Sequence, residues 1–249
     1  QSGSLNNLTL PSSMHAIVLN TIKYSDKDLI VELLTEKDGC LSFMQRINTS
    51  KRAKIRTAWF QPLTRLDVDY DDRPTHKLKR LTAAQPLPLL TIPYEPAKTT
   101  MALFLAEFLR VTMRSEPASP LLFEYVWNSI EWLDTCRESF ANFHLVFLLH
   151  LARFFGFEPN LEAPSPNCYF DLESGTFTTV RPLHPNVLLP EEAQLLPTLM
   201  RMNLATMHLF KLSGEQRSQL LRFMNNYYKL HIPNFAELKS LKVLQEVFA

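Results

Sequence analysis

Five short runs between Met14 and about Ala84 have strand-like patterns of apolar and polar residues. The first is rich in branched apolar residues, and in the fourth Leu66, Val68 and Tyr70 alternate with acidic residues, which is typical of β-strands. The runs read MHAIVLNTIKY, LIVELLTE, CLSFMQR, WFQPLTRLDVDY and HKLKRLTAA. The pair Asp38-Gly39, between the second and third runs, indicates a hairpin turn. Five short strands in so short a segment predict a small β-barrel, because closure removes exposed strand edges.

The pattern becomes helical after Gln85. The sequence QPLPLLTIPYEP holds four prolines and is expected to be a connector. Helices are expected over residues 99–114, 120–136, 142–155, 191–202, 214–231 and 237–248. The most apolar stretch, FHLVFLLHLARFFGF, is shorter than the roughly 20 residues that a membrane span needs and is interrupted by His150 and Arg153. It therefore predicts a core helix.

The sequence CYFDLESGTFTTV, near residues 168–179, predicts a β-hairpin that turns at Ser174-Gly175. The chain is therefore expected to be an α+β protein. A β-barrel over residues 14–85 precedes a mostly helical domain over residues 86–249, which carries this small hairpin. Residues 1–13 contain no charged side chain and no signal-peptide pattern, and we interpret them as a vector leader or a disordered tail.

Composition excludes several classes of function. The 249 residues include five glycines, and no two of them lie close enough to form a phosphate-binding loop. A Walker A loop and a dinucleotide fingerprint are therefore excluded. The three cysteines, Cys40, Cys136 and Cys168, form no CxxC pair, which favours a reducing compartment over a disulfide framework.

The net charge of +1 hides an uneven distribution. Residues 14–85 hold 13 basic and 9 acidic residues, a net charge of +4, and residues 86–249 have a net charge of −3. The segment QRINTSKRAKIRTA, residues 45–58, contains five basic residues and no acidic one, and a second basic group lies at Lys77, Lys79 and Arg80. Basic side chains on the face of a small barrel are suited to a nucleic-acid backbone. A solvated basic loop without a ligand is the alternative interpretation.

Candidate catalytic residues are weakly patterned. No two of the seven histidines have the spacing of a helical metal motif, and no serine stands in a G-x-S-x-G turn. Asp67, Asp69 and Asp72 could together bind a divalent cation for phosphoryl chemistry, or they could form the polar end of a strand. We expect no catalytic residue and no metal ligand.

Three segments, taken in order, resemble the RecO family of bacterial recombination mediators, in the form found in the Bacteroidetes branch. They are YSDKDLIVELLTEKDGCLSFMQR (residues 24–46), LHLARFFGFEPNL (149–161) and YYKLHIPNFAELKSLKVLQEVF (227–248). The similarity extends over nearly the whole chain, from about Met14 to Phe248. It implies an N-terminal OB-fold barrel, a helical C-terminal domain and a cytoplasmic, nucleoid-associated protein that is not an enzyme.

The resemblance also implies partners. Family members bind single- and double-stranded DNA, anneal complementary strands and act with RecR to help RecA displace single-stranded DNA-binding protein. The residues expected to bind DNA are Lys23, Arg46, Lys51, Arg52, Lys54, Arg56, Arg65, Lys77, Lys79 and Arg80. The C-terminal tail of single-stranded DNA-binding protein is expected to bind the helical domain, where Arg110, Arg114, His150 and Arg153 are candidates by their chemistry.

One departure from the family concerns zinc. Many relatives carry a four-cysteine zinc site after the segment that matches residues 156–161, and this chain keeps Cys168 alone in that region. One thiolate cannot form a tetrahedral structural site, so we expect no bound zinc. Two rival functions remain beside DNA annealing: an adaptor whose basic barrel contacts an acidic protein, and a metal-dependent nuclease that uses Asp67, Asp69 and Asp72.

Overall fold

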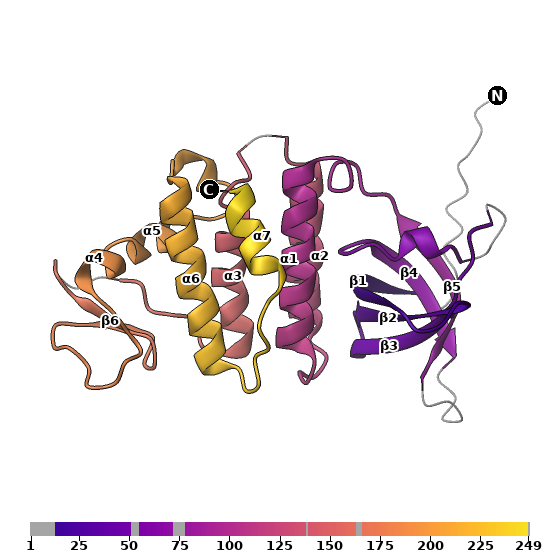
Figure 1. The fold of residues 1–249 in the computed structure, drawn as a ribbon, viewed down its shortest axis with the longest axis horizontal. Helices are drawn as coiled ribbons and strands as arrows, with labels where there is room; N and C mark the ends of the chain where they lie inside the picture. The colour runs from indigo at the N-terminus through magenta and orange to yellow at the C-terminus, as the bar shows by residue number, and fades with distance from the viewer. Residues whose placement is uncertain (1–12, 51–54, 72–77, 138, 163–165, 249) are drawn as a thin grey trace. The chain divides into compact units, whose positions relative to one another are not determined.

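The computed structural model describes residues 13–50, 55–71, 78–137, 139–162 and 166–248 (Figure 1). The chain forms an α+β protein, in which a five-stranded antiparallel sheet precedes a helical region with a small three-stranded sheet. Contacts between backbone atoms divide it into two compact units. One comprises Gln1–Leu89 and Ala106–Trp127, and the other comprises Leu90–Leu105 and Asn128–Ala249.

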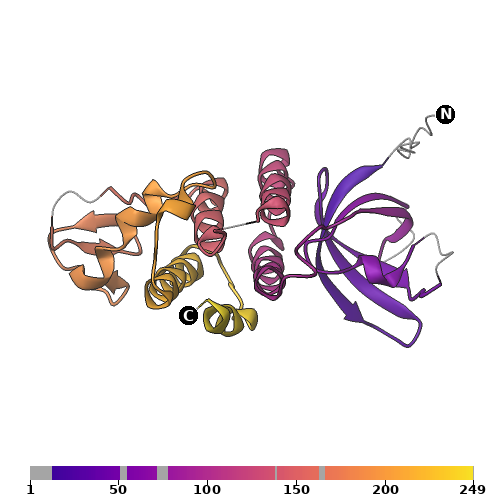
Figure 2. The same cartoon turned by 90° about the horizontal axis from the view of Figure 1, so that it is seen from above.

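The N-terminal sheet contains the five strands that the alternating pattern predicts. They are β1 (Met14–Lys23), β2 (Asp28–Thr35), β3 (Gly39–Arg46), β4 (Arg65–Asp71) and β5 (Arg80–Leu87). Their order in the sheet is β3-β2-β1-β4-β5, and every neighbouring pair is antiparallel. Figure 1 and Figure 2 show that the sheet is strongly curved. Its concave side encloses a core that includes Val18, Val31, Phe43, Leu66 and Val68.

The two edge strands of this sheet approach each other at one point. Phe43 of β3 forms an isolated parallel bridge with Lys79, the residue before β5, and the Met44 N–H donates to the Lys79 carbonyl at 3.0 Å. Within the described residues, no longer ladder joins β3 to β5. Complete closure of the barrel that the sequence predicts is therefore not observed.

Two predicted boundaries in this sheet are wrong. The fourth strand was expected to include Trp59, but Thr57–Trp59 form a short 3₁₀ helix, η1, and β4 starts at Arg65. Pro62 cannot donate to a strand ladder, and Leu63 has a left-handed φ of 59°, so the chain turns there. The connector was expected to start at Gln85, whereas β5 continues through Pro86 to Leu87. A proline is tolerated there because β5 is an edge strand.

The predicted helices are present, with one correction. They are α1 (Pro96–Met113), α2 (Pro120–Thr135), α3 (Phe143–Ala152), α6 (Gly214–His231) and α7 (Ser240–Val247), with 3₁₀ turns η2 (Arg153–Phe155) and η3 (Met207–Leu209). The single helix expected over residues 191–202 is instead two short helices, α4 (Pro190–Ala193) and α5 (Leu196–Arg201). Pro197 has no N–H to donate to the preceding turn, so it begins a new helix instead of continuing the first.

The helical core follows from the apolar composition of α3. Nine of its ten residues are buried, and α3 packs beside α6 (Figure 2). The Tyr228 hydroxyl of α6 donates to the Leu148 carbonyl at 2.8 Å. Gly156, with a φ of 78°, ends the helical segment in the left-handed conformation that glycine adopts readily. Within the described residues, no helix is long and apolar enough to cross a membrane.

The predicted hairpin near residues 168–179 is confirmed. It consists of β6 (Tyr169–Asp171) and β7 (Thr176–Thr178), and Gly175 has a φ of 67° in its turn. The Asp171 carboxylate accepts the backbone N–H groups of Glu173 and Ser174 at 2.8 and 3.3 Å, which fixes the turn. A third strand, β8 (Val187–Leu188), pairs with β6. Two residues give no periodicity, so the sequence could not predict this strand.

Candidate nucleic-acid interface

A cleft of about 340 Å³ opens on the five-stranded sheet and its adjoining turn. Its lining includes three exposed cationic side chains: Lys27 from the turn between β1 and β2, Arg46 at the end of β3, and Arg80 at the start of β5. Asp28, Met44, Gln45 and Leu81 complete the lining. The structure therefore brings two of the predicted DNA-binding residues, Arg46 and Arg80, to one site.

Sequence reasoning missed Lys27. It lies outside the basic runs, and Asp26 and Asp28 flank it in the sequence. The sequence did contain one signal. Lys27 stands directly before the second predicted strand, and the third predicted strand, which pairs with the second in a hairpin, ends at Arg46. In the structure, Asp28 faces Arg46 across the ladder between β2 and β3, so the start of one strand and the end of the other share an edge.

The turn that carries Lys27 is fixed by hydrogen bonds rather than by glycine. The N–H groups of Tyr24 and Ser25 both donate to the Asp28 carbonyl at 3.0 Å. The Ser25 hydroxyl accepts the N–H groups of Lys27 and Asp28 at 3.1 and 3.0 Å. The Lys27 carbonyl accepts the Ile47 N–H at 2.7 Å, which ties the turn to the end of β3.

The charge in this cleft favours an anion. Among the described residues that line it, three are cations and one is a carboxylate, so these residues carry a formal net charge of +2 when all four are ionised. All three cations are exposed and remain strongly hydrated until a ligand replaces water. An extended polyanion fits these features better than a small buried ligand, because the cleft is open and has few apolar side chains.

Three more of the predicted DNA-binding residues contact a neighbouring acidic or aromatic side chain. Lys23 pairs with Asp26 at 3.0 Å, and the Arg56 guanidinium lies 5.5 Å from the centroid of the Trp59 ring. The Lys79 ammonium lies 4.8 Å from the centroid of the Tyr70 ring. The candidates outside the described residues are Lys51, Arg52, Lys54 and Lys77.

Arg65 is buried, unlike Arg46, Arg56 and Arg80, the other described arginines that are predicted to bind DNA. It is 7% exposed, and its guanidinium lies 5.1 Å from the centroid of the Trp127 ring, within the same compact unit. A guanidinium in this position makes little contact with a phosphate in solvent. Arg65 is therefore not part of the proposed interface.

Two of the three acidic residues considered for metal binding, Asp67 and Asp69, lie on β4. The Asp67 carboxylate lies 2.7 Å from His15 Nδ1, and the His15 ring packs 4.6 Å from Trp127. Asp69 lies two residues further along β4, and Asp72 is outside the described residues. Among the residues that the structure describes, no group of three histidine, cysteine or acidic side chains could hold a metal ion. Cys168, the one cysteine in the family's zinc region, is buried.

The four candidate partner-binding residues do not form one described site. Arg110 lies 3.7 Å from Glu32, and Arg114 is exposed after α1, both in the first compact unit. His150 and Arg153 belong to the second unit. Burial lowers the pKa of His150 below its ordinary value of 6.5, and Arg153 adds to this effect. Arg153 pairs with Glu158 at 3.3 Å.

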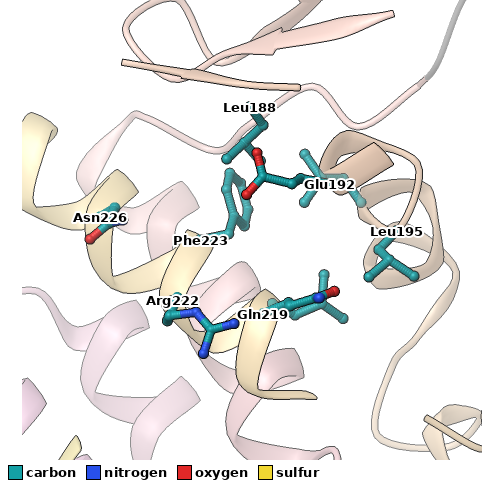
Figure 3. Close-up of a pocket in the computed structure, with 9 residues that line it drawn as sticks. Leu188, Glu192, Leu195, Gln219, Arg222, Phe223 and Asn226 are labelled. Atoms are coloured by element: carbon teal, nitrogen blue, oxygen red, sulfur yellow. The ribbon is translucent and has the colours of Figure 1, made fainter. Parts of the chain in front are cut away.

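The helical unit has a smaller pocket that no sequence motif marks (Figure 3). It has a volume of about 130 Å³, and its lining includes Leu188 after the hairpin, Leu195 between α4 and α5, and Phe223 of α6. Arg222 and Glu192 add one charge of each sign. The Glu192 carboxylate accepts the Leu189 N–H at 3.1 Å and so caps α4. This pocket shows no excess charge that would select a ligand.

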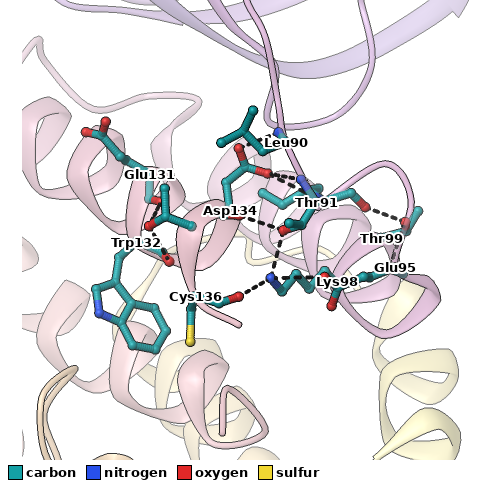
Figure 4. Close-up of polar contacts among 11 residues, drawn as sticks. Leu90, Thr91, Glu95, Lys98, Thr99, Glu131, Trp132, Asp134 and Cys136 are labelled. Atoms are coloured by element: carbon teal, nitrogen blue, oxygen red, sulfur yellow. Dashed lines mark hydrogen bonds and ion pairs between the residues drawn. The ribbon is translucent and has the colours of Figure 1, made fainter. Parts of the chain in front are cut away.

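A buried polar cluster surrounds Asp134 at the end of α2 (Figure 4). Its carboxylate accepts the N–H groups of Leu90, Thr91 and Ile92 at 2.7, 2.9 and 3.0 Å. The fully buried Lys98 donates to the Thr91 hydroxyl at 2.7 Å and to the Cys136 carbonyl. These contacts satisfy backbone groups and position the start of the helical unit, and they leave no reactive group exposed.

Comparison with known proteins gives matches over both halves of the chain. A family model described as "Recombination protein O N terminal" matches residues 11–89, and one described as "Recombination protein O C terminal" matches residues 93–242. A "DNA repair protein RecO" from Bacteroides fragilis is 48% identical over 234 residues, which cover 93% of this chain and 97% of the relative. Proteins with the same name from Phocaeicola vulgatus and Flavobacterium psychrophilum are 45% and 32% identical, and each alignment covers 94% of this chain and at least 97% of the relative.

Proposed function

Because the chain belongs to the RecO family of DNA repair and recombination proteins, we propose that it binds single- and double-stranded DNA and anneals complementary strands. With RecR, it promotes the loading of RecA onto DNA coated with single-stranded DNA-binding protein. It does so as a mediator and breaks no covalent bond. It acts in the cytoplasm, at the nucleoid.

The observation that carries this proposal is the convergence of Lys27, Arg46 and Arg80 on one open cleft. The three side chains come from three separate segments, so their clustering is a property of the fold and not of a single basic run. Cations arranged on a curved sheet can follow a DNA backbone without reading its sequence. Binding without sequence preference suits a protein that must anneal strands of any sequence.

The sheet itself supports an OB-fold barrel. β3 and β5 are the two edges of the sheet, and the parallel bridge at Phe43 and Lys79 joins them where a closed barrel requires contact. We infer that the barrel closes through this point. The cleft then lies beside the junction, since Met44 and Arg80 adjoin the two bridged residues.

We propose a division of roles along the chain. Residues 14–85 contact DNA, and residues 86–249 contact proteins, including RecR and the C-terminal tail of single-stranded DNA-binding protein. Arg110, Arg114, His150 and Arg153 are the candidates for the acidic tail. The exposed side chain of Arg114 is the most available of these arginines, because Arg110 and Arg153 each lie beside a glutamate.

The proposal is tested by strand annealing on complementary oligonucleotides coated with the cognate single-stranded DNA-binding protein. The purified protein accelerates annealing, and the double variant Arg46→Glu/Arg80→Glu does so much less. The exposed Lys37, in the hairpin at the opposite end of β2 and β3 from the cleft, provides the control variant Lys37→Glu, which retains the wild-type rate. No acceleration by the wild-type protein would contradict the proposal.

A further inference from the structure

Tyr24 is an exposed aromatic residue in a polar turn. Its side chain is 64% exposed, although the residues around it are Lys23, Ser25 and Asp26. Among the described residues, its ring makes no hydrogen bond and no ring contact. Single exposed rings are common on protein surfaces, so the significance of Tyr24 depends on the residues that share its turn.

The backbone beneath this ring is held in place. The Tyr24 N–H donates to the Asp28 carbonyl at 3.0 Å, and Lys27 and Asp28 are both held by the Ser25 hydroxyl. A ring on a fixed turn loses little conformational entropy when it binds a ligand. The backbone of Tyr24 is therefore fixed before a ligand binds, and binding restricts the side chain alone.

The same turn forms one wall of the basic cleft. Lys27 and Asp28 line the cleft together with Arg46 and Arg80, and the Lys27 carbonyl accepts the Ile47 N–H next to Arg46. Cationic side chains and an exposed aromatic ring thus share one short, hydrogen-bonded segment. Asp28 is the one acid among the described residues of the cleft lining, and its carboxylate accepts the Ser25 hydroxyl at 3.1 Å.

This combination matches a single strand better than a duplex. A single strand offers a phosphate and an unpaired base whose face is free to stack, whereas a duplex offers phosphates while its bases stay stacked inside. Cations alone would bind both forms through their phosphates. An aromatic ring on the turn that carries Lys27 adds a contact that the single strand alone can use.

We propose that Tyr24 is a stacking platform for an unpaired DNA base whose backbone phosphate is held by Lys27, Arg46 and Arg80. The proposal rests on the proposed DNA-binding function and extends it, since it identifies a residue that makes the cleft selective for single strands. Tyr24 acts by its ring face, so phenylalanine can replace it and alanine cannot.

The test measures binding of three fluorescent oligonucleotides of equal length: oligothymidylate, the same backbone built of abasic residues, and a duplex. The wild-type protein binds oligothymidylate about 5- to 150-fold more tightly than the abasic strand, which corresponds to the 1–3 kcal/mol measured for one stacked base. Tyr24→Ala abolishes this preference and leaves the affinities for the abasic strand and the duplex unchanged. Tyr24→Phe retains it, as does the control Tyr94→Ala, which removes another exposed tyrosine.

The proposal is overturned if Tyr24→Ala retains the preference for oligothymidylate or weakens the binding of all three oligonucleotides equally. The second result would mean that Tyr24 supports the turn and not a base. Failure of the wild-type protein to bind any of the three would contradict the proposed DNA-binding function itself, and the platform with it.

Discussion

The Arg65 guanidinium lies 5.1 Å from the centroid of the Trp127 ring, which places one of the predicted DNA-binding arginines inside the fold. Arg65 belongs to β4, and Trp127 belongs to the part of α2 that is in the same compact unit. The contact joins strand and helix within that unit. Arg65 therefore stabilises the fold, whereas the exposed Arg46 and Arg80 remain available to a ligand.

The variant Arg65→Ala is expected to lower the free energy of unfolding by about 1–3 kcal/mol, because it removes a partly desolvated cation–π contact and the packing of the arginine stem. Urea unfolding followed by circular dichroism measures this change. At a temperature where the variant is folded, the salt dependence of its DNA binding stays at the wild-type value. A reduced salt dependence would show that Arg65 contacts phosphate after all.

The variant Asp134→Ala is expected to lower the free energy of unfolding by about 2–4 kcal/mol, because three backbone N–H groups lose a charged acceptor in a buried site. Thermal and urea unfolding measure the loss. The exposed Asp26, whose one ion pair is with Lys23 in solvent, provides the control variant Asp26→Ala. Equal stabilities of the two variants would contradict the anchoring role of Asp134.

The buried His144 side chain is expected to lower the free energy of unfolding in acid. Burial and the nearby Arg217 lower the pKa of His144 from 6.5 to about 3, so the folded protein keeps the ring neutral. Below pH 6.5 the unfolded chain takes up a proton that the folded chain does not. The free energy of unfolding therefore falls by about 1.4 kcal/mol for each pH unit between pH 6.5 and pH 3 through this residue.

The variant His144→Leu removes the ionisable group, and its stability depends less on pH across this interval. Urea unfolding at several pH values measures the slope. The exposed His208 provides the control variant His208→Leu, whose slope matches the wild type. An unchanged slope in His144→Leu would mean that other groups account for the acid sensitivity.

Zinc is expected to be absent from the purified protein. The cysteines Cys40, Cys136 and Cys168 come from separate elements, and Cys168 is the one cysteine in the region of the family's zinc site. Elemental analysis should give well under one equivalent of zinc, and a chelator should leave the unfolding temperature unchanged. One tightly bound equivalent would contradict this prediction.

The sequence predicted most elements because their signals are local. The branched apolar residues of MHAIVLNTIKY and the apolar stretch FHLVFLLHLARFFGF are signals that depend on neighbouring residues. The turn at Leu63 and the break between α4 and α5 were not predicted, because Pro62 was placed inside a longer strand and Pro197 inside a longer helix. The strand β8 has two residues, and it exists because β6 offers it a partner.

The candidate site was only partly predictable, for a related reason. Charge counting found Arg46 and Arg80, but it could not show that Arg65 is buried against Trp127 or that Lys27 joins the cleft. Both facts depend on which residues face each other across the sheet and on which side of a strand a residue lies. Those relationships join segments that are distant in the sequence.

The central claim is that Arg46 and Arg80 contact DNA phosphates in this cleft. The most direct measurement is the affinity for a labelled single strand at several salt concentrations, for the wild type, Arg46→Glu/Arg80→Glu and Lys37→Glu. The loss of two phosphate contacts is expected to reduce the slope of log affinity against log salt by about 1.4 in the double variant, with weaker binding at every concentration. Lys37→Glu should retain the wild-type slope. A double variant with the wild-type affinity and slope would contradict the claim.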